Sequence, residues 1–147
     1  MQALKQRQRW MSILAHSQPD QLRSHWQALN LSPHYHSLRA PEIGLAQLLG
    51  RMGATGRRFV LGDMTVTRAV VQLDNGSQGY SYIAGRDKAH AELCALIDAL
   101  LQKPDHQEQL LQQLIEPLAA LQQEQRQLRA RSVAASRIDF FTLVRGD

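Results

Sequence analysis

A short turn between two alternating segments constrains the fold more than any other feature of this chain. The run MTVTRAVVQL, residues 64–73, is followed by Asp74-Asn75-Gly76-Ser77 and then by QGYSYIA, residues 78–84. Asn-Gly in such a turn supplies the positive φ angles that a type I′ turn requires. These residues therefore predict an antiparallel β-hairpin.

Two further segments with strand character precede this hairpin. Between His34 and Ala84 the chain runs in short alternating segments, which Pro41 and several glycines separate. IGLAQLLGRM, residues 43–52, and RRFVL, residues 57–61, belong to this pattern. We therefore expect an antiparallel sheet of about four or five strands.

Helical periodicity dominates on both sides of the sheet region. Before it, two short segments separated by Pro19 have apolar residues at helical spacing, which predicts an N-terminal helical hairpin. After Gly85, an apolar stripe widens until little polar face remains, so this helix should lie in the core. The apolar residues are Leu4, Trp10, Ile13 and Leu14, then Leu22, Trp26 and Leu29, and in the core helix Ala89, Leu93, Leu96, Ile97 and Leu100.

A glutamine-rich segment with a narrow apolar seam follows Pro104. Its leucines recur at heptad-like spacing, and Pro117 predicts either a kink or the first turn of a new helix. Such a long amphipathic helix should pack against another helix, in this chain or in another one. The apolar C-terminal segment is also expected to be buried. The predicted partner interface consists of Leu111, Leu114, Leu118, Leu121, Leu128, Phe140 and Phe141.

These patterns predict a single α+β domain over residues 1–147, a length that suits one modest core. No segment has the roughly 18 uncharged apolar residues of a membrane span, and the first residues do not resemble a signal peptide. The single cysteine, Cys94, excludes an internal disulfide and a zinc site built from several cysteines. We expect a cytoplasmic protein without a membrane partner.

The charge of the chain favours anionic partners without specifying nucleic acid. The formal net charge is +4 and most of the basic residues are arginines, which suit phosphate and carboxylate contacts. The arginines are spread along the sequence, however, and neither an RNA-binding aromatic strand nor a DNA-recognition helix is recognisable. Anionic small molecules or protein partners are therefore favoured over nucleic acid.

Two pairs of residues each supply half of a metal site. His90 and Cys94 would share one face of the core helix, with Asp98 one turn further along. Zinc requires three or four ligands and a free cysteine is usually buried, so core packing is the favoured interpretation. His34 and His36 would share one face of a strand without a third ligand. We expect this chain by itself to bind neither a metal nor a cofactor.

The corner Gly85-Arg86-Asp87-Lys88, between a strand and a helix, is the most informative polar segment. Asp87 is a natural N-cap, and Arg86 and Lys88 would place cations beside the N–H groups of the helix start. Such a site could hold a phosphate, but the Asp87 carboxylate would occupy the same N–H groups. A structural corner is therefore favoured over an anion site.

No complete set of catalytic residues is recognisable in the sequence. The loop RMGATGRR, residues 51–58, lacks the lysine and hydroxyl group of a phosphate-binding loop after its second glycine. Neither a GxSxG elbow nor a serine-histidine-acid arrangement is present. The residues alone thus indicate a subunit of a larger assembly.

Four stretches resemble a known family: WMSILAHS, GDMTVTRAVVQL, GYSYIAGRDKAHAELCALIDAL and SRIDFFTLVRGD. They are similar to the PhnG subunit of the bacterial carbon-phosphorus lyase system, which implies a role in phosphonate catabolism. The resemblance implies that the chain joins the H, I and J subunits in a core complex, with I the expected direct contact. It also implies that, with H, I and L, the chain is required to displace adenine from ATP by methylphosphonate, which gives α-D-ribose 1-methylphosphonate 5-triphosphate.

The resemblance places the chemistry on other subunits. It assigns the nucleosidase-like step chiefly to the I subunit, and the iron-sulfur cluster and S-adenosylmethionine to the J subunit. A lone cysteine could not hold a four-cysteine cluster, so radical chemistry is not expected here. Two hypotheses follow: a required but noncatalytic subunit, or a subunit that contributes Arg86, Lys88 and His90 to an anion-binding or catalytic pocket shared with the I subunit.

Overall fold

The structure is a computed structural model that describes residues 2–51 and 58–145, with the surroundings of side chains described for residues 2–47 and 62–136. Two N-terminal helices precede three strands, and a series of helices follows. The elements are α1 (Gln2–His16), α2 (Pro19–Ala28), β1 (Tyr35–Arg51), β2 (Arg58–Leu73), β3 (Gln78–Ala84), α3 (Lys88–Leu101), α4 (Pro104–Leu110), the π-helix η1 (Leu111–Ile115) and α5 (Glu116–Arg145). The expected α+β class and the two N-terminal helices are confirmed.

The described sheet has three antiparallel strands in the order β1-β2-β3, rather than the four or five expected. The runs RRFVL and MTVTRAVVQL are not separate strands, because Gly62 continues one long strand with a φ of 159°. β1 likewise continues through the β-bulges near Ser37 and Arg39 and is 17 residues long. β2 therefore replaces two predicted short strands, and β1 begins well before the predicted run at residues 43–52.

The predicted hairpin joins β2 to β3, but its turn differs from the expected type. The N–H of Gly76 donates to the Leu73 carbonyl at 2.9 Å, and the N–H of Leu73 donates to the Ser77 carbonyl at 2.8 Å. Only Gly76 in this turn has a positive φ, of 94°. A three-residue loop with glycine in this conformation explains the pattern better than a type I′ turn.

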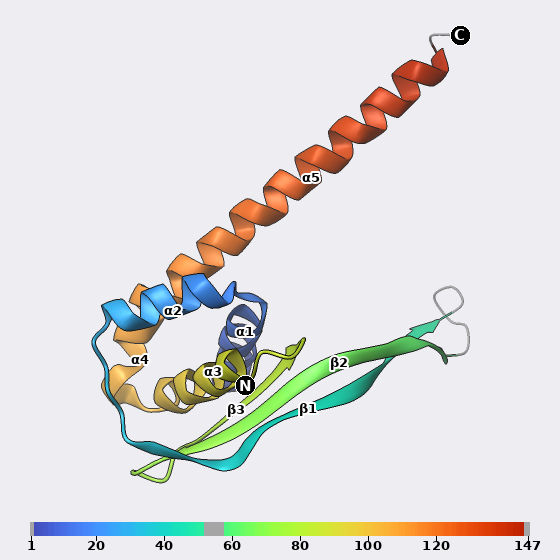
Figure 1. The fold of residues 1–147 in the computed structure, drawn as a ribbon. Helices are drawn as coiled ribbons and strands as arrows, with labels where there is room; N and C mark the ends of the chain where they lie inside the picture. Colours follow the sequence, from blue (N-terminus) through green and yellow to red (C-terminus); the bar gives the residue numbers. More distant parts are fainter. Residues whose placement is uncertain (1, 52–57, 146–147) are drawn as a thin grey trace.

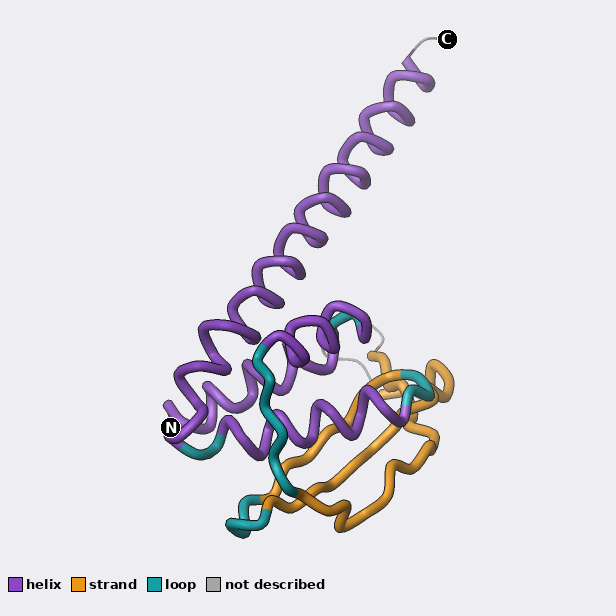
Figure 2. The backbone as a smooth tube through the Cα atoms, turned by 60° about the vertical axis from the view of Figure 1, so that its left-hand side comes forward, coloured by secondary structure: helices purple, strands orange, loops and turns teal. Residues whose placement is uncertain are grey.

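The helices cover one face of the sheet, as Figure 2 shows. α3 packs across β2 and β3 and contains ten buried residues, so the prediction of a core helix is confirmed. α1 lies beside α3 and β3. The largest fully buried hydrophobic side chains are Leu14, Leu22, Val71, Ile97, Leu101, Leu110, Leu114, Ile115 and Leu118.

Pro117 is accommodated without a break between the C-terminal helices. The N–H of Glu116 donates to the carbonyl of Leu111, five residues earlier, which is the wide turn of a π-helix. Since Pro117 lacks an N–H and crowds the preceding turn, a local widening relieves the conflict. α4, η1 and α5 therefore follow one another directly, and Leu114 faces the core.

Two elements extend beyond the packed layers (Figure 1). α5 leaves the body, and its described residues from Arg126 to Ser136 are all exposed. The paired strands β1 and β2 continue past β3, where Leu45 is 72% exposed, and Ile43, just before this arm, is 45% exposed. Among the described residues, no helix is both long and apolar enough to cross a membrane.

Candidate functional site

The corner between β3 and α3 is held by hydrogen bonds from β2 and by a side-chain cap on the helix. Gly85 has a φ of 100°, and its N–H donates to the Thr65 carbonyl at 2.8 Å. The Thr67 hydroxyl donates to the Gly85 carbonyl at 2.8 Å. Asp87 caps α3, because its Oδ1 accepts from the His90 N–H at 2.9 Å. The predicted N-cap is therefore confirmed, and β2 holds the corner in place.

The corner does not bring Arg86, Lys88 and His90 to one surface. Arg86 and Lys88 are exposed, whereas His90 is only 4% exposed. The Asp87 carboxylate already occupies one N–H group of the helix start and carries the same sign of charge as a phosphate. The two exposed cations remain available to an anion, but the buried histidine does not face them across a pocket.

His90 and Cys94 meet at one carbonyl oxygen rather than at a metal position. The His90 Nε2 donates to the Leu14 carbonyl at 3.2 Å, and the Cys94 Sγ lies 3.5 Å from the same oxygen. The Ser17 hydroxyl also donates to it, at 2.6 Å. The His90 Nδ1 is buried without a partner among the described residues. The pair thus ties α3 to the end of α1.

Burial makes Cys94 a protonated, unreactive thiol. Desolvation, with a smaller contribution from the charge of Asp87, raises the pKa of Cys94 to about 12. Since the folded state favours the protonated thiol, the associated stabilisation is complete below about pH 9 and is lost as the pH rises toward 12. We expect a thiol reagent at pH 8 to label the folded protein at least about a hundredfold more slowly than the urea-unfolded protein. Equal labelling rates would contradict this burial.

The other possible metal ligands are not assembled either. Within the described ranges, no group of three or more histidine, cysteine, aspartate and glutamate residues could hold a metal ion. His34 precedes β1 and, like His36, is exposed. Asp98, one turn beyond Cys94, is engaged in other contacts.

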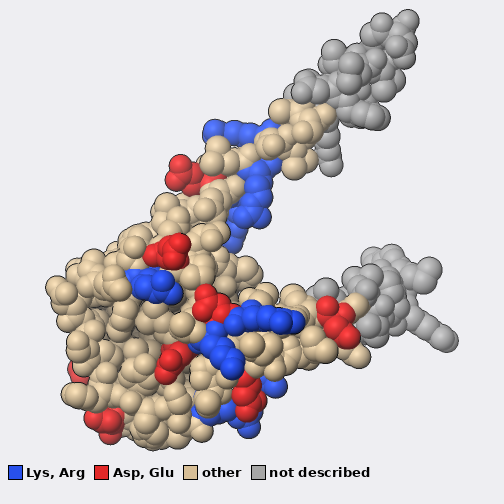
Figure 3. Space-filling view, viewed as in Figure 1, with Lys and Arg blue, Asp and Glu red and all other residues tan. Residues whose placement is uncertain are grey.

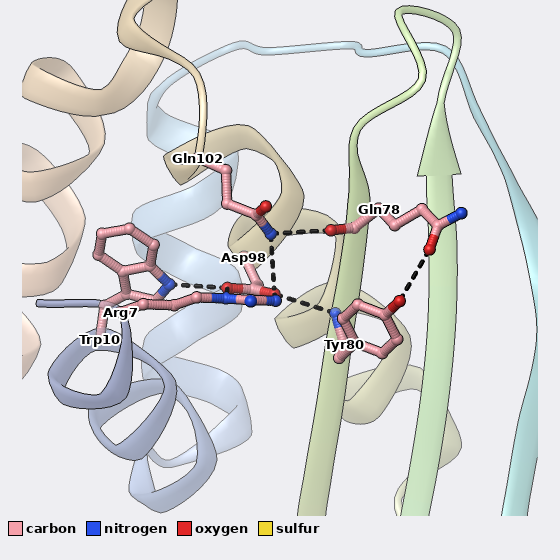
Figure 4. Close-up of polar contacts among 6 residues, drawn as sticks. All are labelled: Arg7, Trp10, Gln78, Tyr80, Asp98 and Gln102. Atoms are coloured by element: carbon pink, nitrogen blue, oxygen red, sulfur yellow. Dashed lines mark hydrogen bonds and ion pairs between the residues drawn. The ribbon is translucent and has the colours of Figure 1, made fainter. Parts of the chain in front are cut away.

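The most highly connected polar group of the described chain is Asp98, which is 1% exposed (Figure 4). Arg7 donates to both of its carboxylate oxygens, at 3.2 and 3.0 Å. The Trp10 indole donates at 2.8 Å, the backbone N–H of Tyr80 at 3.0 Å and the Gln102 amide at 3.3 Å. One carboxylate therefore joins α1, α3 and β3.

The Asp98 carboxylate and the Arg7 guanidinium neutralise each other, which favours a structural role for this network. The hydrogen bond to Asp98 raises the pKa of Arg7, which therefore keeps its positive charge. The Arg7 guanidinium also lies 5.6 Å from the centroid of the Tyr80 ring, within the range of a cation–π contact. Sequence reasoning considered Asp98 only as a distant metal ligand. A single acidic residue within the otherwise apolar run of residues 93–101 was the signal that could have identified Asp98 as a buried partner of a cation.

Residues of the predicted partner interface divide into buried and exposed groups. Leu114 and Leu118 are 0% and 1% exposed, so they belong to the core of this chain and are not available to a partner. Leu111 and Leu121 are half-buried against the core, and Leu128 is 55% exposed on α5. The side chains of Phe140 and Phe141 lie outside the described residues. The free part of the predicted interface therefore begins beyond Leu121.

The fold and its contacts define an α+β protein with a projecting helix, whose best-ordered polar groups hold its own elements together. The family model "Phosphonate metabolism protein PhnG" matches residues 5–146, and the chain belongs to this family. A relative from Rhizobium meliloti (strain 1021) is 39% identical over 142 residues, which cover 97% of this chain and 90% of the relative. That relative is named as alpha-D-ribose 1-methylphosphonate 5-triphosphate synthase subunit PhnG.

Proposed function

We propose that this protein is a required, noncatalytic subunit of α-D-ribose 1-methylphosphonate 5-triphosphate synthase within a carbon-phosphorus lyase core complex. Family membership and the name of the Rhizobium relative support the assembly. The observation that carries the subunit role is the exposure of α5. Its residues from Arg126 to Ser136 are all exposed, so the rest of the described chain does not cover them. Because helices in proteins gain most of their stability from packing, the uncovered part of α5 is suited to a partner.

The proposed partners are the H, I and J subunits, with the I subunit as the direct contact and the L subunit as a functional partner. ATP and methylphosphonate are the substrates of the assembly, and the J subunit carries the iron-sulfur cluster and uses S-adenosylmethionine. The proposal places the protein in the cytoplasm. The exposed Ile43 and Leu45 of β1, at and beyond the end of β3, offer a second apolar contact surface.

The proposed function is tested by adenine release from ATP and methylphosphonate. The purified H, I and L subunits are assayed with this protein present or omitted, and the mass of the complex is followed in parallel. We expect adenine release to require this protein and the complex to lose mass without it. Undiminished release in its absence would contradict the proposal.

The exposed leucine of α5 provides a sharper test of assembly. Leu128→Asp is expected to leave the free energy of unfolding of the isolated chain within about 0.5 kcal/mol, since Leu128 is 55% exposed. Burial of an unpaired charge at an interface should lower co-purification with the I subunit by at least about tenfold. Gln127→Asp, which adds the same charge at the neighbouring exposed position, is the control. Equal recovery of both variants would place the interface elsewhere.

The alternative is a contribution of Arg86, Lys88 and His90 to a pocket shared with the I subunit. The exposure of Arg86 and Lys88 at the start of α3 favours it, and the burial of His90 disfavours it. Under this alternative, Arg86→Ala leaves the complex whole but lowers turnover by orders of magnitude. Normal turnover of an intact complex with this variant would exclude it.

A further inference from the structure

The outer part of α5, from Arg126 to Ser136, carries positive charge that the described body of the protein does not neutralise. Residues 117–136 contain three arginines, Arg126, Arg129 and Arg131, and a single acidic residue, Glu124. All three arginines are exposed, and none forms an ion pair within the part of the chain whose side chains are described. In Figure 3, blue atoms of lysine and arginine lie on the projecting helix.

Other arginines near the base of this helix are paired. Arg9 donates to the Glu116 carboxylate at 2.8 and 3.3 Å, and Arg7 is held by the buried Asp98. The contrast matters because carboxylates pair with arginines where α1 meets α3 and α5, whereas Arg126, Arg129 and Arg131 form no ion pair with any described residue. The three outer arginines are therefore available to carboxylates of another molecule.

A hollow marks the place where a partner could begin its contact with α5. It has a volume of about 460 Å³ and opens between α1 and the base of α5. Ser12, Gln122 and Arg126 are among the residues that line it. Arg126 thus belongs both to the hollow and to the exposed segment of the helix. A surface that enters the hollow would meet Arg126 and then the exposed segment of α5 beyond it.

We propose that the outer part of α5 docks on an acidic surface of a protein partner, with Arg126, Arg129 and Arg131 as its recognition charges. The proposal rests on the proposed function, because the partner belongs to the same assembly. Charge complementarity predicts that the partner surface carries aspartate and glutamate side chains. Their carboxylates accept paired hydrogen bonds from a guanidinium group. Leu128 and Val133, each 55% exposed, add apolar contact area on the same segment.

A protein surface fits these features better than nucleic acid does. Nucleic-acid contacts draw mainly on phosphate-binding cations and base-stacking aromatic groups. The described segment of α5 presents Leu128 between Arg126 and Arg129 and Val133 just beyond Arg131, and it has no aromatic residue up to Ser136. Apolar side chains surrounded by arginine are typical of the centre and rim of a protein interface.

The test compares charge removal with charge retention at the three arginines. The triple variant Arg126→Gln, Arg129→Gln and Arg131→Gln is matched with the triple Arg→Lys variant, in the full-length chain. Each is titrated against a purified complex of the H, I and J subunits between 0.05 and about 0.5 M NaCl. We expect the Gln variant to bind about tenfold to a hundredfold more weakly at low salt, with a smaller salt dependence than the wild type.

The Lys variant and the wild-type protein distinguish a failure of the acidic-surface proposal from a failure of the proposed subunit role. The Lys variant is expected to bind within about threefold of the wild type, because it retains the charges. If the Gln variant binds as the wild type does, or the Lys variant is as weak as the Gln variant, the acidic-surface proposal is overturned while the subunit role stands. Failure of the wild type itself to bind would overturn the subunit role. Arginine-dependent binding of a short RNA, without any effect on subunit binding, would assign the charges to nucleic acid and also overturn the proposal.

Discussion

Replacement of Asp98 by alanine is expected to lower the free energy of unfolding by about 3–5 kcal/mol. The carboxylate accepts hydrogen bonds from Arg7, Trp10, Tyr80 and Gln102 in a site that is 1% exposed. Its removal leaves a guanidinium without its counter-charge and an indole N–H without an acceptor. The loss of buried hydrogen-bond partners is costly because water cannot replace them. Urea unfolding followed by circular dichroism measures the effect.

Asp74→Ala is the matched control for this prediction. Asp74 lies in the exposed turn between β2 and β3, and its replacement should change the free energy of unfolding by less than about 0.5 kcal/mol. Arg7→Met tests the same network from the other side and should leave Asp98 as an unpaired buried charge. If the Asp98 and Asp74 variants unfold at the same urea concentration, the network does not hold α1, α3 and β3 together.

Features that depend on a few neighbouring residues could be predicted from the sequence. The hairpin follows from Asn75-Gly76 between two alternating segments, and the start of α3 follows from Asp87 before an apolar helix. The turn geometry was less predictable, because glycine alone supplies the positive φ angle and Asn75 does not share it. The number of strands was wrong because Gly62 and the β-bulges interrupt the pattern without ending the strands.

Features that depend on distant partners could not be predicted. A row of leucines on a helix indicates that another surface covers it, but not which one. Leu114 and Leu118 are covered by this chain, whereas Leu128 is exposed. The π-helix before Pro117 also shifts the helix face that meets the core. The role of Asp98 could be predicted only by knowing that Arg7, which is 91 residues away in sequence, lies beside it. Spacing along one helix therefore suggested ligands for a metal, whereas the folded chain supplies hydrogen-bond donors from three elements.

Gly79→Ala is the second substitution with a large expected effect. β3 approaches α3 so closely at this residue that an added Cβ would lie 1.8 Å from the Ala95 carbonyl oxygen and 2.7 Å from the Ala99 nitrogen. Both are backbone atoms, so no side-chain rotation can relieve the overlap, and strand and helix must separate. We expect a loss of about 3 kcal/mol or more in the free energy of unfolding, measured by urea titration.

Two variants decide whether the close approach is the cause. Gly44→Ala makes the same chemical change on β1, where the nearest atom to an added Cβ is the Arg68 Nη2 at 3.7 Å, so stability should change little or rise slightly. Ala99→Gly in the Gly79→Ala background removes a Cβ contact of 2.8 Å but leaves both backbone contacts, so it should not restore stability. Rescue by that second change would show that side-chain crowding, rather than contact between the backbones of β3 and α3, limits this position. A Gly79→Ala protein as stable as the Gly44→Ala protein would mean that β3 and α3 do not pack this closely.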